Sequence, residues 1–358
     1  MLVKKIFSHE FYTFVIDGFD NTYLCGYNSY GFDQDIPVKL KYKFANIVCG
    51  EYHMFAFDSY GSIYCSGNNS RGQLGLGDYI NRNDIIKSNH KFKKIICGDA
   101  HNFAYDINDN IYCWGDGSAG QLGIDNKNNQ NKPLLFNHKF KKIITKGSHS
   151  FAIDCNNNVY SWGFNDYGNL GIGRGNNKDI PTSLGFKFKK IISGRHHAFA
   201  FDHNETIWCW GYNYYGQLGI GDKTTQYKPI KFSIQFKKII CGAFHSFAFD
   251  QYGDIWAWGY NYSGQLGIND NIYYNKPVRL NHNFKQIICN FDSIFAVDKF
   301  GDIYAWGYNR QGQLMTGDMS NKNSPTKLKL KMFSQINNIN KLLMKILMGE
   351  KAIDVEFI

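Results

Sequence analysis

The sequence lacks the features that mark several large functional classes. No stretch approaches the roughly 18 consecutive apolar residues of a membrane-spanning helix, and the start of the chain combines no basic segment, apolar run and small-residue cleavage site. Walker, G-x-S-x-G and H-E-x-x-H motifs are absent, and no paired carboxylates stand out. We therefore expect a protein without a membrane span or export signal, which is not an enzyme and has no catalytic residues.

Paired cysteine spacings are also missing. None of the nine cysteines falls in a C-x-x-C pair, whereas zinc sites and disulfide frameworks need paired spacing. The cysteines recur instead at fixed offsets, as small half-buried strand residues would: Cys49, Cys97, Cys241 and Cys289 at one offset, and Cys65, Cys113 and Cys209 at another. We expect no metal, no cofactor and a reducing compartment, so the cytoplasm is the expected location and the nucleus stays open.

The charge is unbalanced. The 358 residues carry a formal net charge of +10, which would suit an acidic partner such as nucleic acid or an anionic membrane surface. The chain is also crowded with Asn, Lys, Ile, Tyr and Phe, residues with AT-rich codons, so a compositional drift toward Lys explains the charge equally well. Nucleic acid is therefore an open partner that no motif supports.

A repeat organises the whole chain. One glycine, which follows Trp in most units, is spaced by 41 residues once and by 48 residues five times: Gly26, Gly67, Gly115, Gly163, Gly211, Gly259 and Gly307. An Asp stands nine residues before each of these glycines, and three residues after the Asp comes Gly, Asp, Asn or Glu. Most of these residues tolerate positive φ, so the segment predicts a hairpin turn.

Each unit predicts four short strands. In the best-formed unit, 236–280, residues 247–250 and 254–258 alternate in period two on either side of the turn. The apolar end of FKKII precedes this hairpin and a proline-led segment follows it. Each small sheet can bury its faces only against neighbouring sheets, so the seven units should close into a β-propeller. We expect residues 325–330 to close the ring by pairing into the blade that holds residues 3–26.

The motifs resemble a known family. WGYNYYGQLG at 210–219 and WGYNYSGQLG at 258–267, with GAFHSFAFD at 242–250 before the second, are similar to the regulator of chromosome condensation (RCC1) repeat over about residues 3–330. The resemblance implies a single seven-bladed β-propeller, an all-β fold. Its relatives include small-GTPase exchange factors, chromatin-binding proteins, ubiquitin-ligase scaffolds and a plant photoreceptor. The uniform spacing of 48 leaves no room for the inserted wedge of the prototype exchange factor, and residue 3 already lies in the first blade, without the basic tail.

Three sets of side chains recur at fixed offsets. Five histidines, His53, His101, His149, His197 and His245, could meet only at the ring axis, so packing or bonding to a loop is expected rather than a metal site. The tryptophans that precede the repeat glycine, Trp114, Trp162, Trp210, Trp258 and Trp306, are expected to pack between blades. A lysine girdle, expected from exposed lysines at one position in six of the seven units, with Ala45 in the other, is the candidate interaction site: Lys4, Lys93, Lys141, Lys189, Lys237 and Lys285. The next offset repeats the charge at Lys5, Lys94, Lys142, Lys190 and Lys238. Such a girdle would attract acidic partners, or would only keep strand edges soluble.

The repeat ends near residue 330. Apolar residues at three- and four-residue steps from 333 to 346 predict an amphipathic helix, so residues 1–330 should form the propeller and residues 331–358 a C-terminal helix and tail. The last seven residues, AIDVEFI, resemble the first strand of a BTB domain. We expect a monomeric, non-catalytic protein-interaction module whose partner is another protein, such as a small GTPase or a ubiquitin-ligase component. The alternative is a guanine nucleotide exchange factor for a small Ras-like GTPase.

Overall fold

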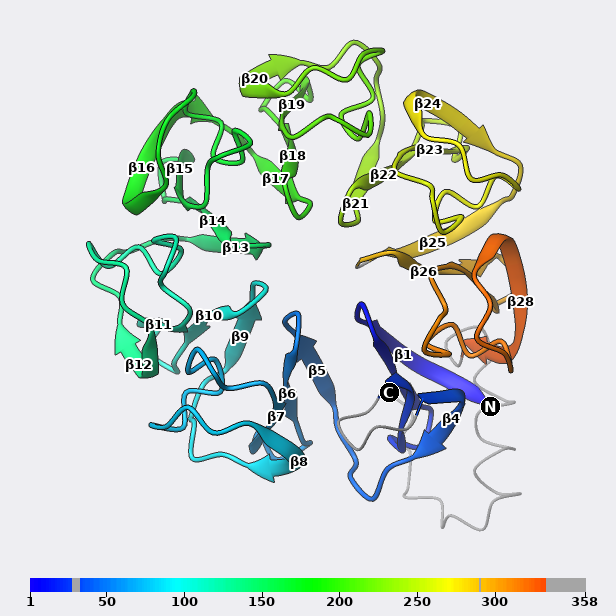
Figure 1. Ribbon diagram of the computed structural model, residues 1–358, viewed down its shortest axis with the longest axis horizontal. Helices are drawn as coiled ribbons and strands as arrows, with labels where there is room; N and C mark the ends of the chain where they lie inside the picture. The colour runs from blue at the N-terminus through cyan, green and yellow to red at the C-terminus, as the bar shows by residue number, and fades with distance from the viewer. Residues whose placement is uncertain (28–32, 290, 333–358) are drawn as a thin grey trace, which may run out of the picture.

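The computed structural model describes residues 1–27, 33–289 and 291–332, and these form seven blades around a central axis. Every blade contains four antiparallel strands in chain order (Figure 1). The innermost strands are β1 (Leu2–Ser8), β5 (Asn46–Cys49), β9 (Lys94–Cys97), β13 (Lys142–Lys146), β17 (Lys190–Ser193), β21 (Lys238–Cys241) and β25 (Phe284–Cys289). The second strands are β2 (Tyr12–Asp17), β6 (His53–Phe57), β10 (His101–Tyr105), β14 (His149–Ile153), β18 (His197–Phe201), β22 (His245–Phe249) and β26 (Ser293–Asp298).

The third and fourth strands complete each blade toward the rim. The third strands are β3 (Thr22–Tyr27), β7 (Ile63–Gly67), β11 (Ile111–Gly115), β15 (Asn158–Gly163), β19 (Ile207–Gly211), β23 (Ile255–Gly259) and β27 (Asp302–Gly307). The outer strands are β4 (Asp33–Lys39), β8 (Arg82–Lys87), β12 (Gln130–Leu135), β16 (Lys178–Lys187), β20 (Gln226–Lys231), β24 (Tyr274–Leu280) and β28 (Lys322–Met332). The repeat prolines lie in these outer strands, where the missing N–H faces no further strand. The predicted all-β, seven-bladed propeller is confirmed.

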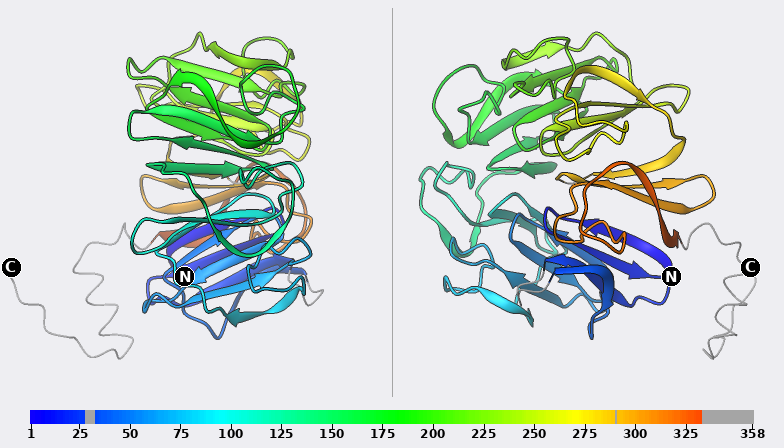
Figure 2. Two further views of the ribbon diagram at one scale, coloured as in Figure 1. Left: turned by 90° about the vertical axis from the view of Figure 1, so that its left-hand side faces the viewer. Right: turned by 45° about the vertical axis from the view of Figure 1, so that its right-hand side comes forward.

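The way the ring closes differs from the sequence prediction. The segment 325–330 lies in β28 and pairs antiparallel with β27 of its own blade, not with the first blade. In the seventh blade, as in the other units, the loop after the third strand turns the chain back, so that β28 pairs with β27. The first blade has four strands of its own, β1 to β4. Only the end of β28 reaches across, where Lys331 and Met332 pair in parallel with Leu2 and Val3 of β1. This seam brings the start of β1 beside the end of β28 (Figure 2).

Backbone geometry explains the repeat glycine. All seven copies have a φ between 97° and 110°, a region that disfavours residues with a Cβ. A Cβ added at Gly211 would lie 2.4 Å from the carbonyl oxygen of His196, and the other six copies face a similar clash. The hairpin turns also follow the prediction, because the repeat Asp accepts backbone N–H groups there; Asp58 Oδ1, for example, accepts from Tyr60 and Ser62.

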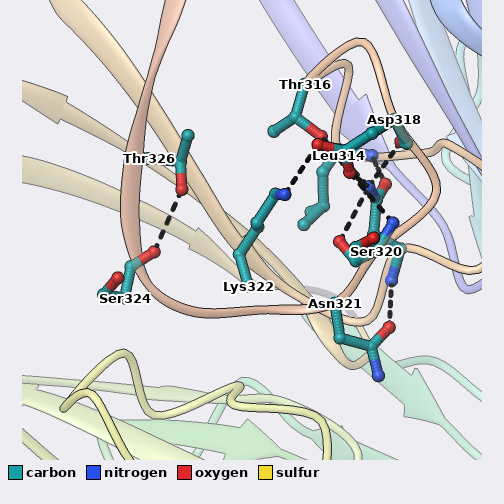
Figure 3. Close-up of polar contacts among 9 residues, drawn as sticks. Leu314, Thr316, Asp318, Ser320, Asn321, Lys322, Ser324 and Thr326 are labelled. Atoms are coloured by element: carbon teal, nitrogen blue, oxygen red, sulfur yellow. Dashed lines mark hydrogen bonds and ion pairs between the residues drawn. The ribbon is translucent and has the colours of Figure 1, made fainter.

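The loop between the third and fourth strands is held by the Asn of the WGxN motif. In the seventh blade the Asn309 side chain accepts the backbone N–H of Leu314 and donates to the carbonyl oxygen of Asp318, both at 2.8 Å. Asn321 in turn accepts the backbone N–H of Asn309, and Lys322 pairs with Asp318 (Figure 3). Asn309 is fully buried, so this residue organises the loop rather than offering a polar group to a partner.

The core is divided among the junctions between blades. The five repeat tryptophans are fully buried, as predicted, and each packs against the preceding blade. The predicted C-terminal helix lies outside the described residues from 333 onward, and residues 331–332 belong to β28. No helix in the described part of the chain is long and apolar enough to cross a membrane.

Candidate interaction surfaces

The strand order gives the ring two distinct faces. The innermost strand begins beside the end of the second strand, for example where Lys94 pairs with Tyr105. We call this the lysine face, because it carries the lysine girdle and the hairpins between the second and third strands. The innermost strand ends on the opposite face, which carries the turns into the second strand and the start of the WGxN loops. We call it the tyrosine face for the exposed tyrosines described below.

The six girdle lysines are all exposed, as expected. Three of them form ion pairs with the acidic residue sixteen positions later, in the hairpin of the same blade: Lys4 with Asp20, Lys93 with Asp109, and Lys189 with Glu205. The other three, Lys141, Lys237 and Lys285, have Asn or Gly at that place and no ion pair among the described residues. The girdle is therefore electrostatically uneven, with the lysines that form no ion pair among the described residues in the fourth, sixth and seventh blades.

The second set of lysines lies one residue further along the chain, where the innermost strands begin. Lys94, Lys190 and Lys238 each place Nζ 5.4–5.9 Å from the centroid of an aromatic ring at the end of the neighbouring strand. Partial burial, together with the charges of Lys190 and Lys94, lowers the pKa of Lys142. These lysines therefore lie close enough to repel one another around the axis, and an anionic group there would relieve the repulsion.

The recurring histidines bind neighbouring blades to one another. The Nε2 atoms of His101, His149 and His197 each lie 3.0 Å from a serine Oγ of the next blade, and His53 Nε2 lies 2.7 Å from Asn102 Oδ1. Four of the five imidazoles, those of His53, His101, His197 and His245, also cover a glycine of their own blade; a Cβ on Gly98 would lie 2.2 Å from His101 Cε1. Among residues 1–27, 33–289 and 291–332, no group of three His, Cys, Asp or Glu side chains could hold a metal ion. The histidines thus pack against and hydrogen bond to residues of neighbouring blades.

A charged cluster that the sequence did not single out lies at the axis on the tyrosine face. Arg195 of the fifth blade reaches across the ring, with Nη2 2.6 Å from Glu51 Oε1 and 3.1 Å from Asp99 Oδ2. The same guanidinium stands 5.6 Å from the ring of Phe291 in the seventh blade. One side chain thus ties together four blades at this end of the axis.

Burial shifts the pKa values of the acids in this cluster upward. Burial raises the pKa of Asp99 to about 6 and that of Asp292 to about 6, although Arg195 opposes both shifts. Burial likewise raises the pKa of Glu10 to about 7, and the buried Oε2 of Glu10 accepts no hydrogen bond from the described residues. A cationic group brought to this surface would favour the ionised form of Glu10.

An aromatic patch adjoins the charged cluster. Ten rings from the fourth, fifth and sixth blades contact one another in a continuous chain, with successive ring centroids 4.7–6.5 Å apart: Phe164, Tyr167, His196, Tyr212, Tyr214, Tyr215, Phe244, Tyr260, Tyr262 and Tyr273. We call these residues the tyrosine patch. Tyr214 and Tyr262 are 62% and 64% exposed, so this patch presents large amphipathic rings to solvent rather than burying them.

Sequence reasoning missed both features because it searched for what the units share. Glu10, Glu51, Asp99 and Arg195 all stand sixteen residues before the repeat glycine, where the remaining units have Gly, Ala and Phe. The signal in the sequence was therefore a single repeat position that is charged in four units and uncharged in the other three. The tyrosines were visible in the WGYNYYG and WGYNYSG motifs, but only the fold shows that consecutive copies touch.

Comparisons with known proteins agree with this geometry. Similar structures are Prp20p from Saccharomyces cerevisiae, described with its binding to Gsp1p and histones (22% identity, TM-score 0.71, 83% of this chain and 80% of that chain), and human WBSCR16 (20%, 0.70, 83% and 84%). Yeast RCC1 (Prp20) bound to Kap60 is also similar (20%, 0.74, 90% and 88%). A comparison with curated protein sequences gave no match. The family model described as RCC1-like domain matches residues 44–350, and the chain therefore belongs to the RCC1-like domain family.

Proposed function

We propose that the protein is a non-catalytic protein-interaction module that binds its partner through the tyrosine face. The observation that carries this proposal is the tyrosine patch, which is continuous over three blades and partly exposed. Tyrosine is enriched at protein interfaces because its ring offers a large apolar area at little conformational entropy and its hydroxyl can still hydrogen bond. A single exposed tyrosine would not indicate an interface, whereas ten rings in contact form a continuous surface that a partner could cover.

The neighbouring charges restrict the partner further. Glu10 and Asp292 lie at the axis beside the patch, and Arg195 is already engaged by Glu51 and Asp99. The carboxylates that remain would favour a partner that presents a lysine or arginine next to apolar side chains. The described partners of similar structures are themselves proteins, namely Gsp1p, histones and Kap60, which supports a protein rather than a small molecule as the ligand of this face.

Guanine nucleotide exchange on a small GTPase is the alternative. It is supported by the fold shared with Prp20p, for which binding to Gsp1p is described. Against it stands the uniform spacing of 48 residues, which leaves no unit room for an inserted wedge. An exchange activity would then have to come from the regular loops of the tyrosine face.

A matched pair of variants tests the proposal. Affinity capture with the full chain identifies partners, and calorimetry with each recovered protein then measures affinity for Tyr214→Ala/Tyr262→Ala and for the control Tyr60→Ala/Tyr252→Ala. The control tyrosines are 92% and 83% exposed but lie in hairpins of the lysine face. We expect the first variant to weaken binding by at least about tenfold and the control to leave it unchanged. Equal affinities for the two variants would contradict the proposed face, and fast nucleotide release from a recovered GTPase would favour the alternative.

A further inference from the structure

The second set of lysines is concentrated on one side of the axis. The position is neutral in the second and seventh blades, which have Asn46 and Gln286, and in the first blade Lys5 Nζ donates to the carbonyl oxygen of Ala45 at 2.8 Å. The third to sixth blades have a lysine there, and we call these four residues the lysine arc: Lys94, Lys142, Lys190 and Lys238. The arc therefore lies across the axis from the seam between β28 and β1 (Figure 1).

The lysines of the arc are exposed and close to one another. The strands that they begin or enter, β9, β13, β17 and β21, are in contact around the axis. None of the four lysines forms an ion pair among the described residues. Partial burial is the main cause of the lowered pKa of Lys142, and the charges of Lys190 and Lys94 add to it. Neighbouring charges of one sign that lack counter-charges attract an anion.

The hairpins beside the arc have lost an acidic residue in two blades. Asn157 and Gly253 take its place in the fourth and sixth blades. Lys141 and Lys237, which would pair with that acid, have no ion pair within the described part of the chain. The remaining carboxylate of the sixth hairpin, Asp250, accepts hydrogen bonds from the backbone of its own turn and from an indole N–H. The positive charge near the arc is thus larger than four lysines alone would give.

A cavity of about 580 Å³ lies beside the arc, between the fifth and sixth blades. Lys190, Lys237 and Lys238 line it together with the hairpin segment 249–253. Phe249 forms part of the wall, and Lys238 Nζ lies 5.4 Å from the centroid of its ring. The volume is typical of ligand sites, which measure about 300–1,000 Å³. Three lysines against one aspartate give this cavity a net positive charge, so it suits a compact anion.

The number and kind of the cations indicate the chemistry of that anion. Lysine ammonium groups act as point charges that bind phosphate oxygens, and each has three donors. A single carboxylate or phosphate would neutralise only a small part of the arc and its two neighbours, Lys141 and Lys237. An extended polyanion would contact the whole face, whereas these charges are gathered on one side of the axis. A small group with several phosphates matches both the charge and the confined space.

We propose that the lysine arc, with the cavity between the fifth and sixth blades, is a binding site for a compact group that carries several phosphates. The group belongs either to a soluble molecule such as an inositol polyphosphate or to a phosphorylated lipid headgroup, which share the same chemistry. The site lies on the lysine face and goes beyond the proposed interaction function, which concerns the tyrosine face.

Two triple variants that remove the same charge test the proposal. Calorimetry at about 0.15 M salt measures the affinity for inositol hexakisphosphate. The arc variant is Lys142→Gln/Lys190→Gln/Lys238→Gln. The control is Lys39→Gln/Lys87→Gln/Lys231→Gln, which changes exposed lysines at the outer strands of the same face. Two lysines of each set lie over an aromatic ring, so the sets also match in local packing. We expect the parent to bind and the arc variant to bind at least about tenfold more weakly than the control.

Further arms identify the source of the phosphates. Co-sedimentation is measured with phosphatidylcholine vesicles that contain phosphatidylinositol bisphosphate. Vesicle binding that is lost in the arc variant would assign a lipid headgroup, whereas binding of inositol hexakisphosphate alone would assign a soluble molecule. Lys142→Glu, compared with Lys87→Glu, replaces the triple variants if these do not fold, and should weaken binding more than its control. The variant Tyr214→Ala/Tyr262→Ala should bind inositol hexakisphosphate as the parent does, which separates this site from the tyrosine face.

Three results would overturn the proposal. The first is failure of the parent to bind inositol hexakisphosphate at this salt concentration, which would leave the arc as a solvated surface. The second is an equal loss of affinity in the arc and control variants, which would show a general attraction to net charge. The third is tighter binding of duplex DNA than of inositol hexakisphosphate, with equal losses in both variants, which would assign the face to an extended polyanion.

Discussion

Mild acid should destabilise this propeller through its buried histidines. Six fully buried imidazoles, His9, His53, His101, His149, His197 and His245, have their pKa lowered, with burial as the main cause in each case. At His101 the Nε2–H donates to Ser150, and the buried Nδ1 has no partner among the described residues. A second proton would therefore sit on Nδ1 in a dry site without an acceptor, which opposes protonation in the folded state.

The sign and the size follow from linkage. Burial lowers the pKa of His101 from 6.5 to about 3, so the unfolded chain binds more protons over this range, and the stability is present at neutral pH and lost as pH falls below about 6.5. At pH 5.5 each such histidine lowers the free energy of unfolding by roughly 1 kcal/mol, and the six together lower it by several kcal/mol. Raised carboxyl pKa values act in the opposite direction: Glu10, Asp99 and Asp292 together return about 3 kcal/mol between pH 7.5 and 5.5.

The net loss of a few kcal/mol is a large part of the whole stability of many domains, about 5–15 kcal/mol. Urea unfolding followed by tryptophan fluorescence at pH 7.5, 6.5 and 5.5 measures it. His101→Gln cannot titrate, so we expect its loss of stability between pH 7.5 and 5.5 to be smaller than that of the parent by roughly 1 kcal/mol. The control His203→Gln, at an exposed hairpin position, should follow the parent. Identical pH dependence in all three proteins would refute the reasoning.

Three further predictions concern the two faces and the seam. Gln substitutions at Lys141, Lys237 and Lys285 should reduce the affinity for heparin, and the salt dependence of that affinity, more than Gln substitutions at the paired Lys4, Lys93 and Lys189 do. Equal effects of the two sets would show that ion pairing does not matter for heparin binding. Arg195→Leu leaves Glu51 and Asp99 without their cation and should lower the free energy of unfolding by about 3–5 kcal/mol, as measured by urea unfolding. Met315→Gly and Cys25→Trp restore the glycine and the tryptophan that pack together at other junctions, as Gly267 and Trp306 do. Each should destabilise the protein, whereas the double variant should recover part of the loss, with a coupling of about 0.5–3 kcal/mol; additive effects would show that the two side chains do not compensate for each other.

The fold could be predicted because the residues that the backbone requires recur in all seven units of the sequence. A single Trp–Gly pair would be weak evidence, but seven glycines, with the same 48-residue spacing in five of the six intervals, identify a backbone position that excludes a Cβ, and the structure shows the φ values that require it. The closure was not predictable in the same way. Residues 325–330 suggested a strand that completes the first blade. A repeat pattern, however, does not say at which residue one blade ends and the next begins. The hydrogen bonds of β28 to β27 place the end of the seventh blade after β28 and the start of the first blade at β1.

The candidate site was only partly predictable, since charge pairing depends on distances that the sequence does not give. The girdle lysines are exposed as expected, but the partners of Lys4, Lys93 and Lys189 lie sixteen residues away, across a hairpin. The contact between Arg195 and Glu51 joins residues 144 positions apart. It exists only because the ring brings the fifth blade opposite the second. No local periodicity carries information about such a pair.

Departures from the repeat therefore need the structure before they can be interpreted. Cys25 and Ser66 look alike in the sequence, since each replaces the tryptophan before a repeat glycine. Around Cys25 the neighbouring Met315 belongs to the same buried cluster, so that departure is a rearrangement of packing. Around Ser66 no described residue takes the place of the indole, although Phe14 and Phe44 are both buried there. The same comparison separates Arg195, which is paired with acids inside the ring, from the exposed tyrosines, which we propose as the contact with a partner.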